Sequence, residues 1–87
     1  MDSEDDLYFT RAMVAFELDE AAQHLQDLTR RLSASSGYGD PEFRIDLGHV
    51  YAHLNRAWHR RNTSSDSPSA DEFDAWSQFP TDVPPVG

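Results

Sequence analysis

Three histidines are spaced so that they could share one flank of a pair of helices. His49 and His53 lie four residues apart in DLGHVYAHLNRAWHRRN, residues 46–62, and His24 belongs to an earlier helical stretch. Residues four apart lie on the same face of a helix. Imidazoles in this arrangement are typical ligands of zinc, iron or copper, and Asp46 could add a carboxylate. The sequence thus offers a metal site made of His24, Asp46, His49 and His53.

A plainer interpretation of the same flank is a polar surface facing water. Facing helices lie about 8–10 Å apart, and side chains at the flank of a pair diverge further. Histidine is one ordinary choice for such a surface, so we treat a divalent transition metal as the alternative to our main hypothesis. His59 points away from this flank and is expected to be a surface residue.

Two heptad-patterned stretches predict the helices that would position these side chains. In residues 3–34 the apolar positions alternate in steps of four and three: Leu7, Val14, Leu18, Ala21, Leu25, Leu28 and Leu32. The stretch that begins at Asp40 repeats this spacing at Phe43, Leu47, Val50, Leu54 and Ala57. The connection SASSGYGDP is short, which favours an antiparallel hairpin. In that hairpin His24 is level with position 51, between His49 and His53.

The remaining residues predict a short third helix within an all-α fold. Ser69 and Glu72 form a capping box that opens the acidic, aromatic segment DEFDAWSQF, which Pro80 ends. The expected organisation is a helical hairpin domain over 1–62, a flexible linker over 63–69, a short aromatic helical segment over 70–79 and a disordered Pro-rich tail over 80–87.

A second apolar face on the first helix predicts an association function. Phe9, Met13 and Phe16 lie on the side opposite the heptad positions, and leaving them in water would forgo about 1.5–3 kcal/mol each. Three occupants could cover this face: the tail, a second copy completing a four-helix bundle, or another protein.

The tail segment offers aromatic anchors for such contacts, at Phe73, Trp76 and Phe79. They could dock within the chain or in the groove of a partner. Our main hypothesis is therefore a small non-enzymatic protein that acts by binding itself or another protein through these two sets of residues.

Composition removes several other function classes. The chain has 87 residues, enough for one small domain, and a formal charge of −9, with acids concentrated at both ends. Binding nucleic acid through its phosphates needs a dense basic face, which is missing. The two acidic ends leave acidic mimicry of nucleic acid as a third hypothesis.

The absence of two residue types limits catalysis further. All seven basic residues are arginines, so Schiff-base chemistry and a P-loop are excluded. No cysteine is present, which excludes disulfides and thiolate ligands. No apolar run approaches the ~20 residues of a membrane span, and the acidic start MDSEDD is unlike a signal peptide. We expect a cytoplasmic protein that is not an enzyme.

Overall fold

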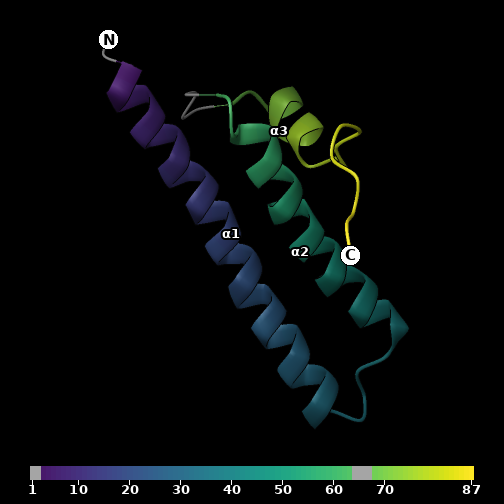
Figure 1. Cartoon of the computed structure of the whole chain (residues 1–87). Coiled ribbons are helices and arrows are strands. Elements are labelled where there is room, and N and C mark those ends of the chain that lie inside the picture. The colour runs from purple at the N-terminus through teal and green to yellow at the C-terminus, as the bar shows by residue number, and fades with distance from the viewer. Residues whose placement is uncertain (1–2, 64–67) are drawn as a thin grey trace.

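The fold is a pair of long antiparallel helices with a short third helix beside it (Figure 1). This computed structural model describes residues 3–63 and 68–87, with side chains from residue 7 onward. Helix α1 spans Ser3–Ala34, α2 spans Asp40–Arg60 and α3 spans Ala70–Trp76. Figure 1 shows α3 beside the C-terminal half of α2, on the side away from α1. The predicted all-α helical hairpin is confirmed.

Local hydrogen bonds set the starts of α2 and α3. The backbone N–H of Gly39 donates to the Glu42 carboxylate at 2.9 Å, and Pro41 occupies the first turn of α2. At α3 the Ser69 hydroxyl accepts from the Glu72 N–H at 3.1 Å, while the Glu72 carboxylate accepts from the Ser69 N–H at 3.0 Å. The capping box predicted for the third helix is therefore confirmed.

The turn between α1 and α2 is held by one carboxylate. The Tyr38 hydroxyl donates to Asp46 at 2.6 Å, and Arg31 donates to the same oxygen at 3.1 Å. Partial burial and the hydrogen bond to Asp46 raise the pKa of Tyr38 to about 12. The same hydrogen bond lowers the pKa of Asp46 below its usual value. One residue from each helix and one from the turn thus meet here, which fixes the register of the hairpin.

The hairpin should therefore lose stability in strong base as Tyr38 ionises. The pKa of Tyr38 is raised in the folded state, so its stabilisation is complete below the unfolded-chain value of about 10 and is lost as the pH rises through about 12. Phenolate absorbance should show one tyrosine ionising near pH 12, and Tyr38→Phe should remove that step. If Tyr38→Phe instead removes a step at about pH 10, the ordinary value for tyrosine, the bond to Asp46 does not form in solution.

The interface between α1 and α2 contains one apolar row and one polar row of side chains. The buried members of the apolar row are each no more than 4% exposed: Ala21, Leu28, Val50 and Ala57. The polar row consists of Thr10, Glu17, His24 and Arg31 on α1 and Asp46, His53 and Arg60 on α2. Successive members of a row on one helix are seven residues apart, the spacing of helices that pack at a shallow angle.

The polar row occupies a part of the interface where the sequence predicts leucines. Leu18, Leu25 and Leu32, which we call the leucine face, were expected between the helices but are 47%, 47% and 52% exposed. Each directly follows a member of the polar row. Neighbouring residues on a helix point about 100° apart, so the rotation that gives Glu17 its partners on α2 turns Leu18 outward.

The aromatic tail docks within the chain, against α2. The Arg56 guanidinium lies over the Phe73 ring, 4.5 Å from its centroid, and that of Arg60 lies 5.1 Å from the Trp76 ring centroid. The Asn55 amide also donates to the backbone carbonyl of Ser77 at 2.9 Å. Flat cations stacked on aromatic rings account for this position of the tail.

Helix α3 therefore does not cover the second apolar face of α1, one of the three coverings that the sequence suggested. Phe16 is 52% exposed, and Phe9 and Met13 are half-buried. Helix α3 packs against α2 and makes no comparable contact with α1. Covering of this face by another chain stays a prediction.

The segments around α3 are partly anchored. Residues 64–67 of the predicted linker lie outside the described residues. Before them, the Thr63 carbonyl accepts a hydrogen bond from Thr10 at 2.8 Å. In the Pro-rich tail, where we expect disorder, Asp82 accepts a hydrogen bond from the Trp58 indole at 2.9 Å. None of the helices in the described ranges is both long and apolar enough to cross a membrane.

Candidate metal centre

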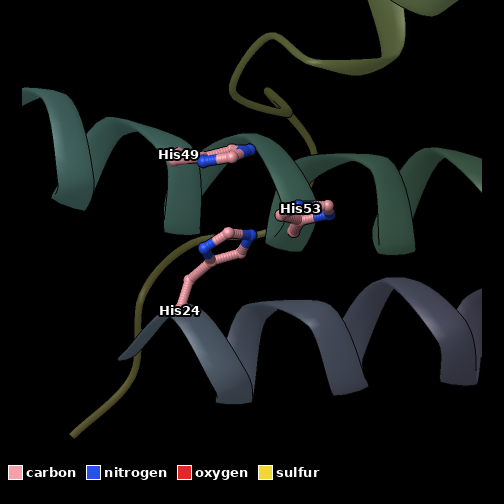
Figure 2. Close-up of side chains that lie close together, drawn as sticks. All are labelled: His24, His49 and His53. Carbon is pink, nitrogen blue, oxygen red and sulfur yellow. The ribbon is translucent and has the colours of Figure 1, made fainter. Parts of the chain in front are cut away.

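His24, His49 and His53, the histidine cluster, meet between the two long helices. Figure 2 shows His24 reaching from α1 toward the two imidazoles of α2. The ring centroid of His24 lies 4.1 Å from that of His49 and 5.1 Å from that of His53, and the latter two are 5.1 Å apart. The register predicted from the short turn therefore brings these side chains together.

The spacing of the cluster suits a metal ion. One ring nitrogen from each histidine can be chosen so that all three lie within 4.8 Å of one another. Zinc binds imidazole nitrogen at about 2.0–2.1 Å, which places tetrahedral ligand atoms ~3.4 Å apart. To bind one ion, the imidazole rings, which are now stacked or tilted against one another, must rotate so that their nitrogens converge.

Glu17 orients one of the three rings. The Nδ1 atom of His53 lies 2.8 Å from Glu17 Oε1, and Arg56 Nη2 lies 3.1 Å from the same nitrogen. A carboxylate can only accept, and its contact is the shorter one, so we assign the proton of His53 to Nδ1; Arg56 Nη2, which can only donate, then makes no hydrogen bond to that nitrogen. The Nε2 lone pair is then free for a metal. Carboxylates commonly hold metal-binding histidines in this way.

The same carboxylate neutralises buried positive charge. Arg56 Nε lies 3.2 Å and Arg60 Nε 3.1 Å from Glu17 Oε2. The side chains of the three residues are only 4–8% exposed. We call Glu17, His53, Arg56 and Arg60 the Glu17 cluster. It shares His53 with the histidine cluster. Its two arginines are the residues on which the aromatic rings of the tail stack.

His49 is held in the neutral form that binds metals. It is the most exposed of the three histidines. Packing of its ring against the others nevertheless removes water, which lowers the pKa of His49, and the charges of His24, His53 and Arg56 lower it further. A neutral imidazole near pH 7 has a lone pair available for coordination.

Asp46, the fourth predicted ligand, is not part of the cluster. Its carboxylate is occupied by the hydrogen bonds from Tyr38 and Arg31 described above. It does line a small cavity of about 30 Å³ beside His24 and His49, together with Asp27 and Arg31. A cavity of that size accommodates about one water molecule, so a further ligand could reach the metal from this side.

The other predicted functional residues lie elsewhere. His59 contacts the backbone carbonyl of Gln78 at 3.1 Å and is separate from the cluster, as predicted. Glu17 was not among the site residues predicted from the sequence. A carboxylate seven residues before His24, and so on the same face of the helix, was the available signal.

The chain matches no known family model, and neither the curated proteins nor the solved structures gave a significant match. Any function assigned to the site must therefore be argued from its own geometry.

Proposed function

We propose that this protein binds a divalent transition metal ion through His24, His49 and His53. The observation that carries the proposal is the convergence of three imidazoles from two helices, with ligand atoms within 4.8 Å of one another. Two supporting features are the Glu17 carboxylate on His53 Nδ1 and the lowered pKa of His49. The proposed role is binding, and we assign no reaction to the site.

The ligand chemistry selects the class of metal. Imidazole nitrogen suits zinc, copper, nickel and cobalt, whereas magnesium and calcium prefer oxygen ligands. Three protein ligands leave a coordination position for water or for a group entering from the cavity near Asp27 and Asp46. The protein's net charge of −9 also favours the approach of a cation.

A bound ion would link α1 directly to α2. The hairpin is small and one of the two rows of side chains at its interface is polar, so such a link should contribute noticeably to its stability. A ligand that binds only the folded state stabilises it by about 2.7 kcal/mol when its free concentration is a hundred times its Kd.

Metal titration of untagged protein tests this proposal. Zinc should raise the melting temperature measured by circular dichroism, and cobalt should give the visible absorption of a nitrogen-coordinated ion. His24→Ala and His49→Ala should each abolish the stabilisation. His53→Ala is less informative because it also removes a partner of Glu17.

His59→Ala is the matched control, since it removes a histidine of the same helix outside the cluster. It should keep the full response to zinc. The proposal fails if zinc leaves the wild-type melting temperature unchanged, or if His49→Ala and His59→Ala respond alike.

Protein association, the function expected first from the sequence, was predicted through the second apolar face of α1 and the tail aromatics. The exposed leucine face is a further surface that favours association. Acidic mimicry of nucleic acid stays a prediction from composition.

A further inference from the structure

The leucine face is an apolar row without a partner among the described residues. Leu18, Leu25 and Leu32 are each about half exposed and lie seven residues apart on α1. Leu54 of α2, directly after the buried His53, is 42% exposed for the same geometric reason. The row directly adjoins the α1–α2 interface and repeats its heptad spacing, so it suits another helix packed at a shallow angle.

A groove beside the leucine face could receive side chains of that helix. It is a shallow, open groove on the surface of α1, lined by Ala22, Leu25, Gln26, Thr29, Arg30 and Ser33. Ala22 and Thr29 are small, and they lie three residues before and four residues after Leu25. Small residues that alternate with leucines let two helices approach closely, with the leucines of one filling the gaps of the other.

Charge along α1 indicates which helix fits this groove. Asp19 lies before Leu25 and Arg30 after it, and both are exposed. Arg30 also pairs with Asp27 on its own helix. In a second α1 that runs antiparallel about Leu25, Leu18 meets Leu32, and Asp19 comes close to Arg30. A parallel copy would place Asp19 and the partner's Arg30 about 16 Å apart along the helix axis, so this pair could not form.

We propose that the occupant is a second copy of this chain, with its α1 antiparallel to the first and Leu25 near the two-fold axis. The two hairpins then form a four-helix bundle. The proposal is independent of metal binding, because all three histidines come from one hairpin and none belongs to the leucine face.

Sedimentation equilibrium of the untagged full chain tests the dimer. The wild type should be a dimer at micromolar concentration, and Leu25→Asp should weaken association at least a hundredfold. Ile45→Asp is the matched control, because Ile45 is a 72% exposed β-branched residue on α2, outside the leucine face. It should leave association within a few-fold of wild type. Circular dichroism should show that both variants keep their helices.

Charge reversal tests the antiparallel orientation. Asp19→Arg and Arg30→Asp should each weaken the dimer, and the double variant should restore it to within a few-fold of wild type. A monomeric wild type, equal effects of Leu25→Asp and Ile45→Asp, or no recovery in the double variant would overturn the proposal.

Discussion

Replacing Glu17 with glutamine should lower the free energy of unfolding by about 3–5 kcal/mol, the cost of leaving buried charges without their partner. Arg56 and Arg60 both contact Glu17 Oε2, at 3.2 and 3.1 Å, and neither side chain is more than 8% exposed. Glutamine keeps the size of the side chain but removes the only anion that the described residues place against these two guanidiniums. Arg60 Nη1 already has no hydrogen-bond partner, so the cluster has little capacity to compensate.

Urea denaturation followed by circular dichroism measures this effect. Glu20→Gln is the control, since Glu20 belongs to the same helix and lies outside the Glu17 cluster; its change should stay within about 0.5 kcal/mol. If Glu17→Gln does not fold at all, adding Arg56→Gln should recover part of the loss by removing one of the unpaired charges. A loss below about 1 kcal/mol in Glu17→Gln would show that the cluster is solvated in solution.

The importance of Glu17 also explains which part of the fold could be predicted. Heptad spacing and the short turn suffice for two antiparallel helices and for the level of His24 against His49 and His53, because these follow from helix geometry. The rotation of α1 does not follow from its own sequence. Leu18 and Glu17 are adjacent, and a rule that buries apolar side chains selects Leu18 for the interface.

The observed rotation depends on what α2 offers in return. His53, Arg56 and Arg60 give Glu17 three contacts, a complementarity that becomes visible only when the two helices are placed side by side. Asp46 illustrates the same limit for the metal site. Its spacing from His49 suggests a ligand, but Tyr38 in the turn binds its carboxylate at 2.6 Å.

The tail should stabilise the hairpin through the same two arginines. In the double variant Phe73→Ala with Trp76→Ala, both stacking contacts on Arg56 and Arg60 are lost. Because Phe73 is 41% exposed and Trp76 half-buried, we expect a loss of about 2–4 kcal/mol, part of the value for fully buried aromatic residues. Val86→Ala, at a 95% exposed position, should change stability by less than about 0.5 kcal/mol.

Combining these changes with Glu17→Gln separates two origins of that stability. If the rings only bury apolar surface, the losses from Glu17→Gln and from the aromatic variant should add. If Glu17 holds Arg56 and Arg60 in position for the rings, the combined loss should be smaller than the sum by about 0.5–3 kcal/mol. We expect the second result, because Arg56 contacts Glu17, Phe73 and the Ser77 hydroxyl at once. Strict additivity in urea denaturation would mean that the tail and the Glu17 cluster are energetically separate.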